Sequence, residues 1–266
     1  MPVTKIRGVN INWQVIGDRG PWIMLTTGGR RGHDEFIPLA RKLAARGHRV
    51  VLHDRRNTGA SDVLIEGEAG EEVIWTEDMH ELMKSLGALP AFFGGSSSGA
   101  RTSILFALRN PADVRGLLLL RVTGGAFAAG RLPENYYGQF IRAAREGGMA
   151  AVCATEQYQE RIKANPRNAA YLEKLSPEKF IAVMTRWNAI FEAGGHHPVM
   201  GVSEQGPGLS CCIAREFPSG PRASGALLSR TRHRCTDPSW GVSRRRLRPP
   251  RRVLTAACRA DRGKRS

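Results

Sequence analysis

The stretch AFFGGSSSGA, residues 91–100, decides the fold. An apolar run ends in two glycines, and three serines and a glycine follow before the apolar pattern resumes in RTSILFALRN. Residues 95–99 fit G-x-S-x-G, a weak signal alone because glycine and serine are common in loops. An apolar strand pattern precedes it and an amphipathic helix pattern follows it. We therefore predict a sharp strand–turn–helix unit that presents Ser97 as a nucleophile, and not a flexible linker.

The two glycines of this pattern have a steric role in the predicted turn. At so tight a turn, a Cβ at Gly95 or Gly99 would collide with neighbouring backbone. The serine at the apex would project its hydroxyl away from the sheet. The helix that follows begins with free N–H groups, which stabilise negative charge that develops beside the serine.

Strand and helix patterns alternate on both sides of this turn. The start of the chain predicts two antiparallel strands, and short continuous apolar runs predict buried parallel strands with helices on both faces of the sheet. After "LLLLRVTGG" only helical patterns continue to about residue 195, which predicts a helical cap over one end of the sheet. The expected regions are a core at 1–125, a helical cap or lid at 126–200, and an irregular, Arg-rich segment at 201–266.

Residues 1 to about 203 resemble the α/β-hydrolase fold family. GGSSSGA is similar to the family's nucleophile turn, and HDRRNTGASD (53–62) resembles its D-x-R-G-x-G-x-S segment, with Asn57 where glycine is usual. TTGGRRG (26–32) stands where the family has its oxyanion loop, with Thr27 in place of the usual histidine. The resemblance implies an α/β fold with a mostly parallel sheet, helices on both faces and a helical cap.

The resemblance also implies roles for three residues. Ser97 would be the nucleophile, the N–H of Ser98 would form half of the oxyanion hole, and the N–H of Gly29 or a neighbour would form the other half. Serine at the apex, where other members carry aspartate, argues against epoxide hydrolase or dehalogenase chemistry of the aspartate type. It favours hydrolysis of an ester, lactone, thioester or carbon–carbon bond in a small molecule, with no cofactor and no metal.

The acid and the histidine that activate such a serine stay unknown. In this fold the order is serine, acid, histidine. Asp113 is expected at the opposite end of the sheet from Ser97, and the other candidates are Glu204, Glu216, Asp237, Asp261, His196, His197 and His233. None of these late residues follows a recognisable strand. We therefore expect the activity of this chain to be impaired.

The sequence changes character near residue 204. The last 63 residues hold fourteen Arg and one Lys against two Glu and two Asp, so they carry +11 of the net charge of +16, and four of the five cysteines. Three interpretations are open: a basic segment that binds an anionic partner, a solvated disordered tail, or a reading frame that changed near this point. We favour the third, because the last strands expected of the fold are missing here.

These features set the remaining expectations. No apolar run of about 18 residues and no signal peptide can be read, and the cysteines follow no disulfide or zinc spacing, so we expect a cytoplasmic protein without a membrane partner. Nucleic acid is not expected, because no aromatic residues accompany the arginines of the tail; the oligomeric state is unknown. The alternative to a hydrolase is a non-catalytic protein of the same fold whose basic tail binds an anionic partner. His33 is expected in a surface loop, and His53 and Asp54 in structural roles.

Overall fold

The computed structural model describes the backbone of residues 2–194, and the side chains of these residues except 125–127 and 192–194. The described residues belong to one compact unit. The expectations for residues 201–266, including the missing last strands and the changed reading frame, lie outside the described residues.

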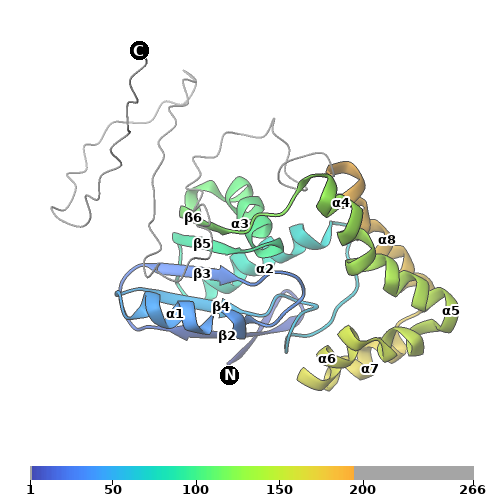
Figure 1. The fold of residues 1–266 in the computed structure, drawn as a ribbon. Coiled ribbons are helices and arrows are strands. Elements are labelled where there is room, and N and C mark those ends of the chain that lie inside the picture. Colours follow the sequence, from blue (N-terminus) through green and yellow to red (C-terminus); the bar gives the residue numbers. More distant parts are fainter. Residues whose placement is uncertain (1, 195–266) are drawn as a thin grey trace, which may run out of the picture. The chain divides into compact units, whose positions relative to one another are not determined.

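The described strands form one six-stranded sheet in the order β1-β2-β4-β3-β5-β6. β1 and β2 form an antiparallel hairpin, and β2 runs antiparallel to β4. The pairs β3–β4, β3–β5 and β5–β6 are parallel, which confirms the predicted mostly parallel sheet (Figure 1). The strand bounds are β1 Val3–Ile6, β2 Val9–Ile16, β3 Trp22–Thr26, β4 Arg49–His53, β5 Ala91–Ser96 and β6 Val114–Leu120.

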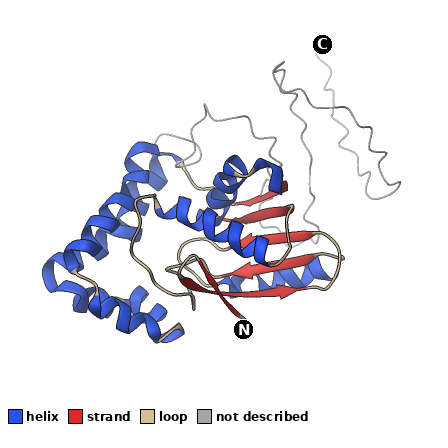
Figure 2. Ribbon diagram, turned by 180° about the vertical axis from the view of Figure 1, so that it is seen from behind, coloured by secondary structure: helices blue, strands red, loops and turns tan. Residues whose placement is uncertain are grey.

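Helices cover both faces of this sheet (Figures 1 and 2). Alternate residues of a strand point to opposite faces. Thus Ile23 and Leu25 pack in one core with α1, whereas Met24 packs in another with α2 and α3. The helical elements of this part are the 3₁₀ turn His33–Phe36, α1 Ile37–Ala44, α2 Glu71–Ser85, α3 Ser98–Arg109 and the 3₁₀ turn Pro111–Asp113.

Residues 125–194 are helical, and we call them the cap segment; their buried side chains form a hydrophobic core that also includes Val63, Ile65 and Ile74. Tyr137, Phe140, Trp187 and Phe191 are buried in that core, as their helical spacing predicts. Helix α5 bends where Gly147 and Gly148 leave helical geometry. The elements are α4 Gly125–Pro133, the π-helical turn Glu134–Gly138, α5 Gln139–Ala154, α6 Glu156–Ala164, α7 Arg167–Lys174 and α8 Pro177–Gly194.

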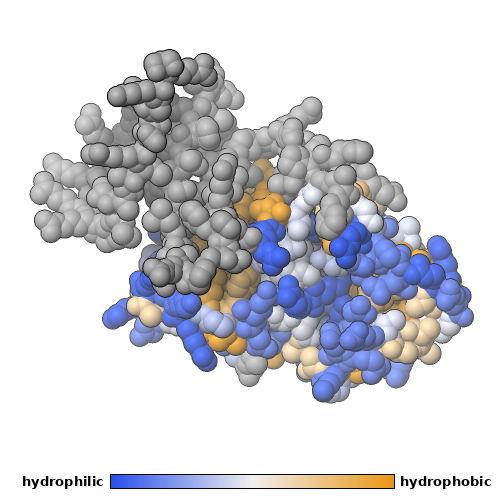
Figure 3. All heavy atoms as spheres, in the orientation of Figure 1, coloured by the Kyte–Doolittle hydropathy of each residue, from blue (hydrophilic) through white to orange (hydrophobic). Residues whose placement is uncertain are grey.

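The surface of the cap segment is mainly hydrophilic on the face that Figure 3 shows. This distribution is typical of amphipathic helices that turn one side to solvent. Among residues 2–194, no helix combines the length and the apolar character that a bilayer crossing needs.

Candidate active site

The serine turn lies where β5 passes into α3. β5 ends at Ser96, α3 begins at Ser98, and Ser97 between them has φ 55° and ψ −117°. A positive φ is strained for a residue with a side chain, so the surrounding contacts must hold it. The Ser97 N–H donates to the carbonyl oxygens of Leu120 (3.0 Å) and Arg121 (3.1 Å) at the end of β6. The neighbouring strand therefore fixes the strained residue.

The glycines of the turn are sterically required, as predicted. A Cβ at Gly95 would lie 2.2 Å from the Thr26 carbonyl oxygen, and one at Gly99 would lie 2.1 Å from the same atom. A Cβ at Gly28 would lie 3.0 Å from the Cβ of Ser97. The end of β3 and the loop after it therefore lie directly against the serine turn, and no larger residue fits between them.

Solvent reaches this turn at Ser97. Every other residue from Phe93 to Ile104 is buried, and Ser97 is partly exposed. The backbone geometry thus presents one hydroxyl-bearing side chain at the carboxyl end of the sheet, above the N-terminus of a twelve-residue helix. Negative charge is stabilised at such a helix end.

The loop after β3 brings Gly29 close to the start of α3. Gly29 has φ +59°, and its carbonyl oxygen accepts a hydrogen bond from Ser98 Oγ at 3.3 Å. Within the described part of the chain, no acceptor takes a hydrogen bond from the backbone N–H groups of Gly29 and Ser98. The structure therefore brings together the three residues that the sequence indicated, Ser97, Ser98 and Gly29.

His33 is buried, and the expectation of a surface-loop histidine is wrong. Its side chain is 2% exposed because Asp54 holds it: Asp54 Oδ1 accepts from the backbone N–H of His33 (2.7 Å) and lies 2.8 Å from Nδ1. The other ring nitrogen lies 2.7 Å from Gln14 Nε2. Both nitrogens of His33 are therefore occupied away from Ser97.

Asp54 has the structural role that the sequence indicated. Besides His33, it accepts from Asn12 Nδ2 (2.9 Å) and from the N–H of Ala60 (2.8 Å). Burial alone would raise the pKa of Asp54, but these hydrogen bonds outweigh burial and lower it. The carboxylate thus orders three backbone segments around the end of β4.

Two other histidines also lie apart from Ser97. His80 Nε2 lies 2.8 Å from Asp113 Oδ2, and Asp113 precedes β6, at the opposite end of the sheet from the serine turn, as expected. His53 is buried, and neither ring nitrogen has a hydrogen-bond partner among the described residues. Burial, and next the charge of Arg55, lower the pKa of His53 to about 3. Among the described residues, no histidine forms a hydrogen bond with the Ser97 side chain.

A buried ion pair beside the serine turn was not anticipated from the sequence. Arg30, in the loop after β3, makes two hydrogen bonds to Glu71 at 2.8 and 2.6 Å. Glu71 also accepts from Tyr137 of the cap segment (2.7 Å) and from Asn57 (2.9 Å). Burial alone would raise the pKa of Glu71, but Arg30 and these hydrogen bonds lower it. Glu71 therefore joins the loop after β3, the 53–62 segment and the cap segment.

Two more arginines are buried here. Arg101, one turn into α3 from the serine, forms an ion pair with Glu72. Arg55 lies over the ring of Trp75, 4.2 Å from its centre, and donates to the carbonyl oxygen of Gly29 at 2.6 Å. In sequence, DRRN resembles a hydrophilic loop and EE resembles the ordinary acidic first turn of a helix, so no local signal marks these residues as buried.

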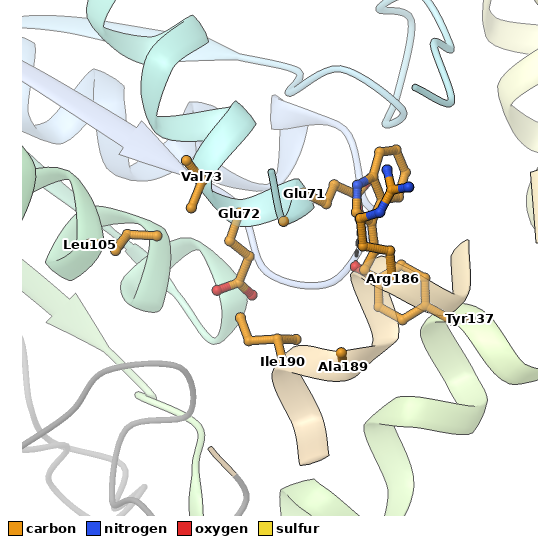
Figure 4. Close-up of a pocket in the computed structure, with 10 residues that line it drawn as sticks. Glu71, Glu72, Val73, Leu105, Tyr137, Arg186, Ala189 and Ile190 are labelled. Carbon is orange, nitrogen blue, oxygen red and sulfur yellow. Dashed lines mark hydrogen bonds between the residues drawn. The ribbon is translucent and has the colours of Figure 1, made fainter. Parts of the chain in front are cut away.

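A pocket of about 370 Å³ lies between the start of α2, α3 and α8 (Figure 4). Its walls are apolar apart from the side chains of Glu71, Glu72 and Arg186, and the Glu72 carboxylate points towards Ile190. Among the described residues that line it, Ser97 is absent. The pocket is therefore a neighbour of the buried charges and not a cavity centred on the serine.

The remaining candidates cannot be placed. His196, His197, His233, Glu204, Glu216, Asp237 and Asp261 all lie outside the described residues. Within residues 2–194, no group of three or more His, Cys, Asp or Glu side chains is arranged to hold a metal ion.

Known proteins resemble part of this chain. Residues 21–140 match the family model described as alpha/beta hydrolase fold. An uncharacterized hydrolase, YraK, of Bacillus subtilis (strain 168) is 33% identical over 114 residues, which cover 43% of this chain and 41% of that protein. The sn-1-specific diacylglycerol lipase ABHD11 of Mus musculus is 32% identical over 109 residues, which cover 41% of this chain and 33% of the lipase. The matched stretch thus spans less than half of either relative.

A solved structure resembles the chain over a longer stretch. The enol-lactonase from Burkholderia xenovorans LB400 is 22% identical, covers 72% of each chain and has a TM-score of 0.46. The family match includes the strands β3 to β6, the loop after β3 and the serine turn. Residues 21–140 of this chain are therefore similar to the α/β-hydrolase fold family, and the described residues have the mostly parallel sheet and the helices of an α/β fold.

Proposed function

We propose that the chain is a serine hydrolase that cleaves an ester, lactone, thioester or carbon–carbon bond in a small molecule, with Ser97 as its nucleophile. The observation that carries the proposal is the backbone of Ser97, with φ 55° and partial exposure in an otherwise buried turn. Strain of this kind persists only where surrounding structure enforces it, and it is concentrated at functional sites.

The backbone N–H groups of Gly29 and Ser98 are the oxyanion hole in this proposal. Both are free of other acceptors among residues 2–194, and the helix N-terminus at Ser98 adds to their positive potential. When Ser97 Oγ attacks a carbonyl carbon, the carbonyl π electrons move to its oxygen, and these N–H groups stabilise that charge. The serine proton needs a base, which the described residues do not supply.

The expected activity is therefore weak. An oxyanion hole and substrate binding without an acid–base pair retain an acceleration on the order of 10³–10⁴ over water. The relatives named hydrolase and lipase support the reaction class, and they do not fix the substrate of this chain. We place the protein among hydrolases of small molecules, without a membrane partner, in the cytoplasm.

Hydrolysis of p-nitrophenyl acetate by the full chain and two variants tests the proposal. The unsubstituted chain is expected to carry an acetyl group on Ser97 during turnover, and Ser97→Ala is expected to form no acetyl-enzyme and to keep only the slow hydrolysis that the oxyanion hole and binding support. Ser85→Ala is the matched control, because it also removes one serine hydroxyl. Ser85 is the last residue of α2, and its hydroxyl donates to the Leu82 carbonyl oxygen (2.8 Å). This variant should keep the full rate. No acetyl-enzyme in the unsubstituted chain, or an acetyl group that persists in Ser97→Ala, would overturn the proposal. The alternative, a non-catalytic protein whose basic tail binds an anionic partner, would then be favoured. A salt-dependent gel shift of a nucleic acid by the full chain is the test of that alternative.

A further inference from the structure

Arg55 carries a positive charge that is buried without an ion-pair partner among the described residues. Its side chain is 2% exposed, and no carboxylate among residues 2–194 forms an ion pair with it. The other buried arginines beside the serine turn, Arg30 and Arg101, each have a glutamate. Burying a charge without a directly paired counter-charge is costly, and Glu71 and Glu72 act on Arg55 without forming an ion pair with it.

The contacts of Arg55 lead to the two residues of the proposed oxyanion hole. Nη2 donates to the Gly29 carbonyl oxygen at 2.6 Å, and Nη1 donates to Ser98 Oγ at 3.3 Å. Ser98 Oγ in turn donates to the same Gly29 carbonyl at 3.3 Å. One guanidinium therefore fastens the loop after β3 to the first residue of α3.

Arg55 is itself held rigidly. Its guanidinium lies over Trp75, 4.2 Å from the ring centre, and its carbonyl oxygen accepts from Thr58 Oγ1 at 2.8 Å. Burial, and to a lesser extent the nearby Arg30, lower the pKa of Arg55 to about 10, although Tyr136, Glu71 and Glu72 oppose the shift. The side chain is therefore still charged at neutral pH, and its planar donors are fixed in direction.

We infer that Arg55 is a positioning residue: it holds Gly29 and Ser98 so that their N–H groups meet the developing oxyanion, and it supplies positive charge behind them. The inference rests on the proposed function of Ser97. A fixed positive charge beside the site lowers the energy of a transition state that gains negative charge, and affects the bound ground state less. The effect belongs in the chemical step and not in binding.

Inactivation by a fluorophosphonate measures that step. Ser97 Oγ forms an O–P bond, the P–F bond breaks, and fluoride and the hydroxyl proton leave to solvent. The dependence of the rate on reagent concentration separates the limiting rate, kinact, from the half-saturating concentration, KI. Arg55→Met is expected to lower kinact about 10- to 100-fold, because the loss of one oxyanion donor costs on the order of 10²–10³. KI should stay within about twofold of the value for the unsubstituted chain. The kinact of Arg55→Lys should lie between those of the unsubstituted chain and Arg55→Met.

Arg161→Met is the matched control. Arg161 is also buried, lies over an aromatic ring at 4.5 Å (Tyr158), and has a pKa that burial lowers to about 10, but it belongs to α6 of the cap segment. Its replacement removes a similar buried cation without touching Gly29 or Ser98. Melting temperatures of both variants show whether each is folded.

The outcomes separate the inference from the function on which it rests. Equal kinact for Arg55→Met and Arg161→Met, with Ser97 still labelled, overturns the role of Arg55 and leaves the hydrolase proposal standing. No labelling of the unsubstituted chain overturns both. If Arg55→Met does not fold, Ser98→Ala takes its place, since it keeps the N–H but removes the hydroxyl between Arg55 and Gly29. A kinact lowered about threefold or more then supports the inference, and an unchanged kinact overturns it.

Discussion

The two ends of the parallel sheet each carry a histidine–aspartate pair and an arginine–glutamate pair, in opposite surroundings. At the carboxyl end, the side chains of His33 and Asp54 are 2% and 4% exposed. At the amino end, those of His80 and Asp113 are 20% and 33% exposed, at the same 2.8 Å separation. The two histidine–aspartate pairs thus have the same contact distance, although one is buried and the other is partly exposed to solvent.

The arginine–glutamate pairs repeat this difference. Glu71 is buried against Arg30, whereas Glu77 meets Arg109 on the surface at 3.1 Å. A partly solvated pair is screened by water, and a buried one leaves an uncompensated charge when it is broken. The comparison teaches that burial, and not contact distance, decides how much each pair contributes. The buried pairs also surround the serine turn, so stability and the site depend on the same residues.

Glu71→Gln is expected to have the largest effect. It leaves Arg30 buried with a neutral partner, and we predict a loss of about 3–5 kcal/mol in the free energy of unfolding. The matched change Glu77→Gln should cost less than about 1 kcal/mol. Urea unfolding at pH 7 measures both. Similar losses for the two variants would remove the contrast between the two ends of the sheet.

Asp54→Asn comes next. The amide has one acceptor oxygen where the carboxylate serves His33, Asn12 and the N–H of Ala60, so buried donors lose their partners. A loss of about 2–4 kcal/mol is expected. Asp113→Asn serves as the counterpart at the amino end and should change stability by less than about 1 kcal/mol. Urea unfolding measures both variants. If the urea concentration at the unfolding midpoint of Asp54→Asn were close to that of the unsubstituted chain, the structural role of Asp54 would be contradicted.

The pH dependence of stability sharpens the comparison further. The pKa of His53 is lowered to about 3 in the fold, chiefly by burial, so the unfolded chain takes up a proton that the folded chain resists. This contribution is fully present above the unfolded pKa of about 6.5 and is lost as the pH falls, by about 2 kcal/mol at pH 5. His53→Leu should reduce the loss between pH 7 and pH 5 by that amount. An unchanged pH profile would show that His53 is protonated in the fold.

Much of the fold could be predicted from the sequence, because apolar runs and glycines act locally. The strands β3 to β6 are continuous apolar segments, and the serine turn is marked by Gly95 and Gly99, whose positions no Cβ can occupy. The local pattern predicts the turn that presents Ser97, the family resemblance implies Ser98 and Gly29, and the structure brings the three residues together.

The buried charges could not be predicted, because their partners are distant in the chain. Arg30 and Glu71 are 41 residues apart, and Glu71 and Tyr137 are 66 apart. His33 follows two arginines and a glycine, a context typical of an exposed loop; Asp54, 21 residues later, makes it a buried residue. A hydrophilic stretch indicates an exposed segment only where no distant residue of opposite charge or matching hydrogen-bonding capacity packs against it in the fold.

The most direct test of the central claim is to locate a fluorophosphonate adduct by mass spectrometry of the full-length chain and of its proteolytic peptides. The account predicts one adduct per chain, on the peptide that contains residues 91–100 and at Ser97, and no adduct in Ser97→Ala. An adduct on Ser96, Ser98 or a distant residue, or no adduct after prolonged exposure, would contradict the assignment of Ser97 as the nucleophile.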